Sequence, residues 1–260
     1  MVPANTVAAA PLERAAIQAL ETDLRHAPSR AARGQVRRAV RAWLTAPDGT
    51  RGLVLSAADL CGSPLLVVGA ELAGAAAEVV LDYGPDSQSV GAPQSDYSVK
   101  LQGSLTPMTE VPALGRYIAR FASRHRLEPG AMQDGGGALY QLQVSAAELC
   151  PSEGDSIGLE TTEYLLDYGD APDHTQREWD NLAHQNYQHL DINEQLVTQM
   201  LALPAGRWLL TGLDPEGMDF RLGETFCRLP FPEVAITQKQ MGAAIKLYLA
   251  EARRRLNINP

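Results

Sequence analysis

The chain has 260 residues, of which 45% are hydrophobic and 20% are charged, so it is long enough to bury one large core or two small ones. Its longest apolar runs are strand-sized and interrupted, which excludes a membrane-spanning helix and predicts no membrane insertion. The formal net charge of −9 argues against a general binder of nucleic acid or of anionic membranes.

The N-terminal part of the chain predicts two helices. The first runs from Leu12 to Leu24 within an N-terminal extension of residues 1–28. The second begins at Ser29, a good N-cap, and continues to about Leu44. It carries a cluster of arginines: Arg30, Arg33, Arg37, Arg38 and Arg41. We interpret this cluster as a solvated helix face, with a docking face for an acidic partner as the alternative.

The next segment, residues 29–166, predicts an antiparallel split β-barrel. Short β-rich runs are separated by Gly, Pro, Ser and Asp, and apolar and polar residues alternate within them, as in half-buried strands. One helix at 111–126 interrupts the strands, which is typical of a small closed or split barrel. The expected strands are 51–57, 64–69, 77–83, 97–105, about 140–144 and about 156–166.

The last part of the chain predicts a small α-βββ-α module over residues 176–260, after a polar linker at 167–175. A continuous helical region is expected from Gln176 to Leu203. Three strands follow at 208–213, 218–222 and 225–229, and Asp214 to Gly217 has the composition of a type I turn. Thr237 and Gln240 form a capping box that begins the last helix. The expected fold class is therefore α+β.

Cysteine usage indicates the compartment. Cys61, Cys150 and Cys227 are odd in number and widely spaced, so they form neither a disulfide framework nor a zinc knuckle. We therefore expect a soluble protein in a reducing compartment, either the cytoplasm or an organelle.

Two motifs in the C-terminal part resemble a known family. The segment 212–222, GLDPEGMDFRL, and the following RLPFP at 228–232 are similar to the module beside the barrel in HugZ-type heme-utilisation proteins. That module usually contains a helix that reads His-Met-Asn-Glu-Asp-His. The matching residues 184–189 read HQNYQH, which keeps both histidines and the asparagine. Val99 to Gly103 resembles a central strand of the flavin-binding split barrel, and the whole resemblance covers residues 35–255.

The resemblance implies a split barrel related to pyridoxamine-phosphate oxidases, usually as a homodimer. Some members bind FMN, and some bind and degrade heme. A plastid branch regulates tetrapyrrole synthesis by binding glutamyl-tRNA reductase, so the plastid is among the expected organelles. The fold carries over to this chain, but function does not follow from fold alone.

Candidate FMN anchors are few. The family places polar residues after the second barrel strand, where this chain has GAELAGAAA at 69–77, with one carboxylate and no cation, hydroxyl or amide side chain. A flavin phosphate normally recruits such groups. The remaining candidates on adjacent strands are Arg51, Ser56, Lys100 and Gln102, with ordinary strand-face residues as the favoured alternative.

Candidate heme ligands are His184, His189 and His174. On a continuous helix, five residues rotate by about 500°, which leaves His184 and His189 about 140° apart. The two rings then cannot share a metal unless the helix breaks. The alternative is that each histidine satisfies hydrogen bonds where the helix packs. His26 and His125 are expected on the surface.

No nucleophile, paired-carboxylate or zinc pattern stands out, so no catalytic residue is assigned. The leading hypothesis is a non-catalytic protein that acts through contact with a protein partner, as a regulator linked to tetrapyrrole or heme or as an accessory subunit. A heme-binding or heme-degrading enzyme is the alternative. An FMN-dependent oxidoreductase is the third hypothesis.

Overall fold

The computed structural model describes residues 27–69, 78–84, 87, 96–108, 111–125, 137–167 and 172–258. The expected helix from Leu12 to Leu24 and residues 70–77 of the alanine-rich stretch lie outside these ranges.

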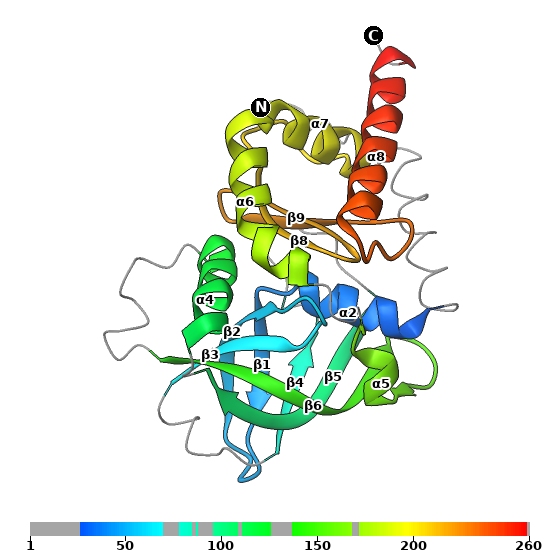
Figure 1. Ribbon diagram of the computed structural model, residues 1–260. Coiled ribbons are helices and arrows are strands. Elements are labelled where there is room, and N and C mark those ends of the chain that lie inside the picture. Colours follow the sequence, from blue (N-terminus) through cyan, green and yellow to red (C-terminus); the bar gives the residue numbers. More distant parts are fainter. Residues whose placement is uncertain are drawn as a thin grey trace, which may run out of the picture.

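Six antiparallel strands close into a barrel in the order β3-β2-β1-β4-β5-β6, and β6 pairs back onto β3. A seventh strand, β7, pairs with the distal half of β6. This arrangement confirms the expected α+β split-barrel fold (Figure 1). The strands are β1 (Arg41–Thr45), β2 (Arg51–Ala58), β3 (Pro64–Val68), β4 (Val79–Tyr83), β5 (Tyr97–Pro107), β6 (Ala138–Pro151) and β7 (Ile157–Leu159).

Alternation of side chains explains the barrel. Along β5, Tyr97, Val99 and Leu101 are buried in the barrel core, whereas Lys100 and Gln102 are exposed on its outside. A register shift follows at Gly103, where an added Cβ would lie 2.0 Å from the carbonyl oxygen of Gln143. The close approach of β5 and β6 therefore requires glycine at this position.

Helix α2 (Pro28–Arg38) packs against the barrel core through Ala31, Ala32 and Val36. The prediction that this helix continues to Leu44 was wrong, because residues 41–45 form β1 and pair with both β2 and β4. Ala42 and Leu44 are buried there between more accessible neighbours, which is strand spacing. Pairing on both sides thus overrides the helical propensity of these residues.

Two further helices accompany the barrel. Helix α4 (Val111–His125) covers the outer face of the barrel and packs Phe121 against Ala57, Leu65 and Leu139. The prediction of a strand at 156–166 was correct only for β7, because the capping box of Glu160 and Glu163 starts the short helix α5 (Thr161–Tyr164), which buries Tyr164 in the barrel core.

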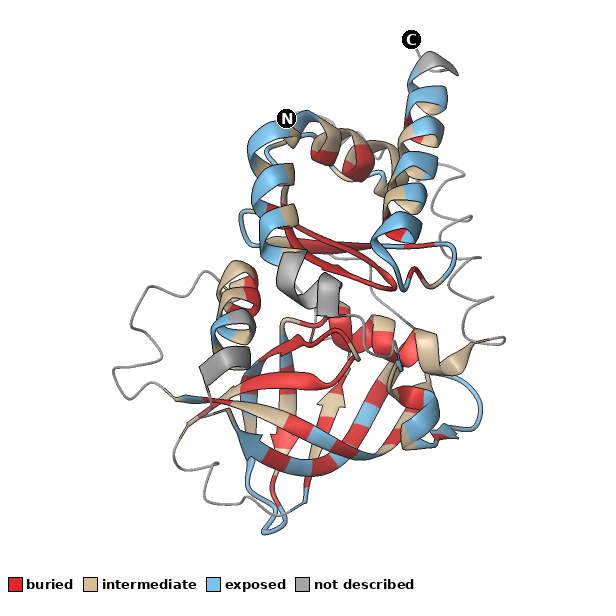
Figure 2. Cartoon of the chain, viewed as in Figure 1, coloured by how far each residue is buried: buried red, intermediate tan, exposed pale blue. Residues whose placement is uncertain are grey.

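The C-terminal module comprises α6 (Pro172–Gln188), α7 (Leu190–Leu201), β8 (Leu209–Asp214), β9 (Gly217–Leu222), β10 (Thr225–Pro230) and α8 (Gln238–Ile258). Its three-stranded sheet lies between α2 and the module's helices (Figure 1), and the sheet is largely buried (Figure 2). Trp208, Phe220 and Phe231 form the centre of a second core. None of the described helices is long and apolar enough to cross a membrane.

Several local predictions for this module can be checked. The two-residue turn between Asp214 and Gly217 is confirmed. The capping box is also confirmed, since the Gln240 backbone N–H donates to Thr237 Oγ1 at 3.2 Å and the Thr237 N–H donates to Gln240 Oε1 at 2.8 Å. The continuous helix was wrong in two respects. It begins at Pro172, within the expected linker, and it breaks at His189.

Candidate functional site

The basic helix α2 faces the C-terminal module rather than solvent. Arg33 and Arg37 are buried, and both bind the turn between β8 and β9. Arg33 Nε donates to both carboxylate oxygens of Glu216, at 3.1 and 3.0 Å, and Arg37 also contacts Glu216. The interpretation as a solvated face was therefore wrong for these two arginines. The acidic surface that they bind belongs to the same chain.

Three more arginines complete what we call the interface charge cluster. Arg228 on β10 donates to Asp214 at 2.9 and 2.8 Å and to Asp219 at 2.8 Å. From α4, Arg120 donates to Glu178 at 2.6 Å, and Arg124 lies 3.7 Å from Asp219. The members of the cluster are Arg33, Arg37, Arg120, Arg124, Arg228, Glu178, Asp214, Glu216 and Asp219. Ion pairs therefore connect the barrel and its helices to the module.

The pairing fixes the charge of the turn. Burial alone would raise the pKa of Asp214, but Arg228 and Arg37 outweigh it and hold the pKa well below its ordinary value. Burial is likewise outweighed by Arg37 and Arg33 at Glu216, whose pKa is also lowered. Both carboxylates are therefore ionised at neutral pH. Groups held in one charge state by bidentate partners are suited to joining elements rather than to exchanging protons.

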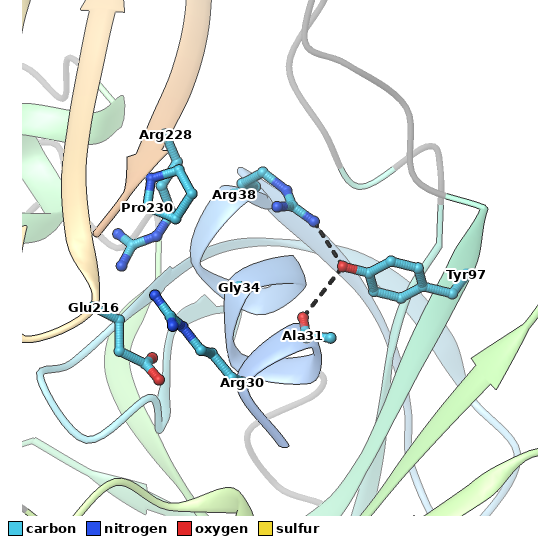
Figure 3. Close-up of a pocket in the computed structure, with 8 residues that line it drawn as sticks. All are labelled: Arg30, Ala31, Gly34, Arg38, Tyr97, Glu216, Arg228 and Pro230. Carbon is cyan, nitrogen blue, oxygen red and sulfur yellow. Dashed lines mark hydrogen bonds between the residues drawn. The ribbon is translucent and has the colours of Figure 1, made fainter. Parts of the chain in front are cut away.

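A small cavity lies beside this cluster, at the junction of α2, β5 and β10 (Figure 3). Its volume is about 30 Å³, far below the roughly 300 Å³ at which ligand pockets begin. Arg38 donates to the Tyr97 hydroxyl at 2.9 Å, and that hydroxyl donates to the Ala31 carbonyl at 3.3 Å. The cavity has room for water but not for a flavin or a porphyrin. It is lined by Arg30, Ala31, Gly34, Arg38, Tyr97, Glu216, Arg228 and Pro230.

The candidate FMN anchors do not converge. Ser56 faces the barrel interior, where its hydroxyl lies 2.9 Å from that of Tyr83. The other three are exposed, and the guanidinium of Arg51 lies over the Trp43 ring at 4.6 Å.

On the outer face, Lys100 is the cross-strand neighbour of Asp82 and of Glu148, so two acids flank this cation. Gln102 faces outward on the same strand. Because the four residues lie on opposite faces and the local charge is unfavourable for a phosphate dianion, they do not fit one flavin phosphate.

The candidate heme ligands lie on the module. The break at His189 brings its ring to 5.1 Å from the ring of His184, between centroids and nearly perpendicular. His184 is exposed and His189 is half-buried. The helix places the backbone of His174 about 15 Å along the axis from that of His184, and the His174 side chain lies outside the described residues. Among the described residues, no group of three or more His, Cys, Asp or Glu gathers as a metal site.

His125 is not the surface residue that the sequence suggested. It is partly buried at the end of α4, where Nε2 lies 2.8 Å from the Ser56 carbonyl oxygen and the ring packs on Phe121 at 4.3 Å. Burial, with a smaller contribution from the cation of Arg124, lowers its pKa to about 3. The neutral ring therefore donates a hydrogen bond to β2 at neutral pH.

Sequence reasoning missed an exposed aromatic surface on α6. Trp179 is 57% exposed and Tyr187 is 84% exposed. With Ala183 they follow i, i+4, i+8 spacing along one side of the helix, beside the side that carries the buried Leu182, and we call these three residues the α6 aromatic face. Residues 178–201 contain four acids and no Lys or Arg. The signal available in the sequence was the i, i+4, i+8 spacing of these three residues, which differs in phase from the position of Leu182.

Comparisons with known proteins add one finding. No protein-family model matches the chain, and no curated protein matches it. Among solved structures, the protein Atu2129 of Agrobacterium tumefaciens strain C58, described as of unknown function, is 18% identical with a TM-score of 0.66, over 87% of this chain and 97% of that chain. The two proteins share the split-barrel fold.

Two solved structures with lower TM-scores have descriptive names. A heme binding protein from Mycobacterium smegmatis is 17% identical over 87% of this chain and 98% of that chain, with a TM-score of 0.41. A pyridoxamine 5'-phosphate oxidase-related, FMN binding protein from Nostoc punctiforme is 12% identical over 62% of this chain and 97% of that chain, with a TM-score of 0.32. At these scores the likenesses carry no functional argument.

Proposed function

We propose that this protein acts through contact with another protein rather than through chemistry of its own. In line with the resemblance of its C-terminal motifs, it serves as a regulator linked to tetrapyrrole or heme, or as an accessory subunit of a larger assembly. The single observation that carries this proposal is the α6 aromatic face.

The two exposed aromatic side chains of α6 lie on one side of the helix, and residues of this type are suited to protein contact. Trp and Tyr bury large areas on binding and are enriched among the residues that contribute most to protein interfaces. Here Trp179 and Tyr187 lie on a helix that is held against β8, where the Asn186 amide donates to the Leu210 carbonyl at 2.8 Å. A partner would therefore meet a rigid surface, which lowers the entropic cost of binding.

Charge specifies the partner further. The acids around this face include the exposed Asp180 and Asp191, and no cation occurs between residues 178 and 201. Electrostatic complementarity favours a partner with an apolar groove bordered by Lys or Arg. A homodimer, which the resemblance implies, stays a prediction. The exposed Leu53 and Leu55 on the outside of β2 offer a separate apolar surface for it.

Partner capture with matched variants tests the proposal. The tagged full chain is purified from its own cells as wild type, as the double variant Trp179→Ala/Tyr187→Ala, and as Leu247→Ala, which removes a side chain that is 59% exposed on α8. We expect one defined partner to be retained by the wild type and by Leu247→Ala and to be lost from the double variant. Equal retention by all three would contradict the proposal.

Heme binding is the second candidate, because one observation favours it. His184 is exposed one helical turn from Tyr187, so an imidazole and an aromatic ring stand together at the surface. As oriented in the structure, the two histidine rings lie too close to bind opposite faces of one heme, since axial ligands place ring centroids more than about 6 Å apart and these lie at 5.1 Å. A single axial ligand is the remaining arrangement.

Absorbance spectroscopy tests this candidate. If heme binds here, its Soret band on addition to the purified protein shifts when His184, His189 or His174 is replaced. Unchanged spectra in all three variants would rule out these ligands. A flavin or Soret band at full occupancy in the protein as purified would count against the contact proposal.

A further inference from the structure

The break between α6 and α7 juxtaposes two imidazoles that a continuous helix would separate. His189 leaves the helical conformation, with φ −137° and ψ 36°, and α7 begins at the next residue. The turn in the chain brings the His189 ring to 5.1 Å from the ring of His184. We call residues 184–193 the elbow.

A network of amide side chains around the buried Asn193 holds the elbow in place. The fully buried Asn193 donates to the Trp208 carbonyl and to Asn186 Oδ1, both at 3.2 Å, and it accepts from Gln185 at 3.1 Å. Asn186 in turn pairs with both backbone groups of Leu210, at 2.8 and 2.7 Å. The amides thus join α6, α7 and β8. Because this network fixes the backbone on both sides of His189, it holds in place the backbone positions from which the two imidazoles extend.

The spacing matches that of two ligands of one ion. Imidazole nitrogens bind zinc at about 2.0–2.1 Å, so two histidines in a tetrahedral site have ring centroids about 5 Å apart. The observed separation is 5.1 Å. Rotation about the terminal torsion of a histidine is soft, and His184 is exposed, so its nitrogen is free to reorient toward an ion.

The surroundings favour a cation. Asp180 stands one turn before His184 and Asp191 lies two residues after His189, and both are exposed. No Lys or Arg occurs between residues 178 and 201. The segment that contains the two histidines therefore has an excess of acids over Lys and Arg, and imidazole ligands select zinc, copper or nickel over magnesium or calcium.

From these observations we propose that His184 and His189 form a binding site for a divalent transition-metal ion, with water at the remaining coordination positions. Since the described residues supply no third His, Cys, Asp or Glu ligand, the site is open on its solvent side. It differs from the axial heme ligation considered above, because both imidazoles bind one ion and no porphyrin takes part.

Calorimetric titration with Zn²⁺ tests the site on the full chain, with any affinity tag removed. We expect one ion per chain, and we expect His184→Ala and His189→Ala each to lower the affinity at least about tenfold, as loss of one ligand of two should. Gln188→Ala is the matched control, since this exposed residue lies between the two histidines and is not expected to bind. Circular dichroism verifies that all variants are folded.

Nuclear magnetic resonance supplies a second readout. The ring signals of His184 and His189 should shift together as Zn²⁺ is added to the wild type. Affinity unchanged in either single variant would overturn the proposal, because an ion shared by both rings requires both. Partner capture is measured separately with variants of Trp179 and Tyr187, so failure of the metal site is distinct from failure of the contact function.

Discussion

Arginines and carboxylates are buried where the barrel meets the C-terminal module, whereas Trp179 and Tyr187 are exposed on the outer side of α6. In the usual distribution, charged groups face water and large aromatic groups are buried. The interface charge cluster departs from this distribution because its charged groups are buried. The α6 aromatic face departs from it because its large aromatic groups are exposed. The difference indicates that the two surfaces of α6 have different tasks, since Glu178 joins the interface charge cluster and the aromatic residues face solvent.

Buried ions are a costly way to join two elements. Apolar residues of similar volume are often as stabilising as a buried ion pair, although removal of one partner leaves an uncompensated charge. What the pairs add is geometry: the forked hydrogen bonds from Arg33 and Arg228 hold the β8–β9 turn in one orientation. The module is thereby fixed on the barrel, and the α6 aromatic face is presented in a defined direction.

The largest effect is expected from the cluster itself. Asp214→Ala leaves Arg228 and Arg37 without a central carboxylate, and we expect it to lower the free energy of unfolding by about 3–5 kcal/mol, measured by urea denaturation. Glu251→Gln is the matched control, because it breaks an exposed pair with Arg254 and should scarcely move the urea midpoint. Similar small losses in both variants would show that the cluster does not hold the module.

As the pH falls, the contribution of His125 to the free energy of unfolding should be lost before that of the interface charge cluster. The pKa of His125 is about 3 in the folded chain against an ordinary 6.5. Its contribution is therefore complete above pH 6.5 and is lost as the pH falls toward 3. Between pH 7 and pH 5 the free energy of unfolding should fall by about 2 kcal/mol, at about 1.4 kcal/mol per pH unit below 6.5.

His125→Asn retains an N–H donor and should abolish that slope in urea denaturation repeated at each pH. Asp214 and Glu216, whose pKa values are lowered, contribute stability that begins to be lost near the ordinary carboxylate values of 3.8 and 4.5 and continues to fall as the pH drops through the lowered values. An unchanged slope in the variant would assign the acid sensitivity elsewhere.

A smaller effect is expected at the elbow. Asn193→Ala leaves Asn186 and the Trp208 carbonyl short of a donor, and we expect a loss of about 1–3 kcal/mol in urea denaturation. The ring signals of His184 and His189 should then no longer shift together when Zn²⁺ is added. Gln188→Ala should change neither quantity, and equal behaviour of the two variants would show that the amides do not position the rings.

Much of the fold could be predicted from local signals. Alternating residues such as Val99 and Leu101 indicated the barrel strands, and the Thr237–Gln240 capping box indicated the start of α8. The burial of Arg33 and Arg37 against Glu216 could not be predicted from local signals, because Glu216 lies 183 and 179 residues away from them in the chain. From the sequence alone, Glu216 is predicted only to be part of a turn.

The candidate site was predicted less well than the fold. The motif at 184–189 drew attention to both histidines, yet no Pro or Gly marks the break that brings them together. Amide contacts with β8 fix that break, and they form only when the module folds. The strand β1 was missed for a similar reason, since it depends on pairing with two neighbours.

The most direct test of function is the affinity of the purified partner for the α6 aromatic face. Calorimetry should give at least about tenfold weaker binding for Trp179→Ala/Tyr187→Ala than for the wild type, as expected for two central aromatic contacts. Leu247→Ala should bind like the wild type, and all three proteins should unfold at the same urea concentration. Equal affinity of the double variant and the wild type would contradict the proposed contact function.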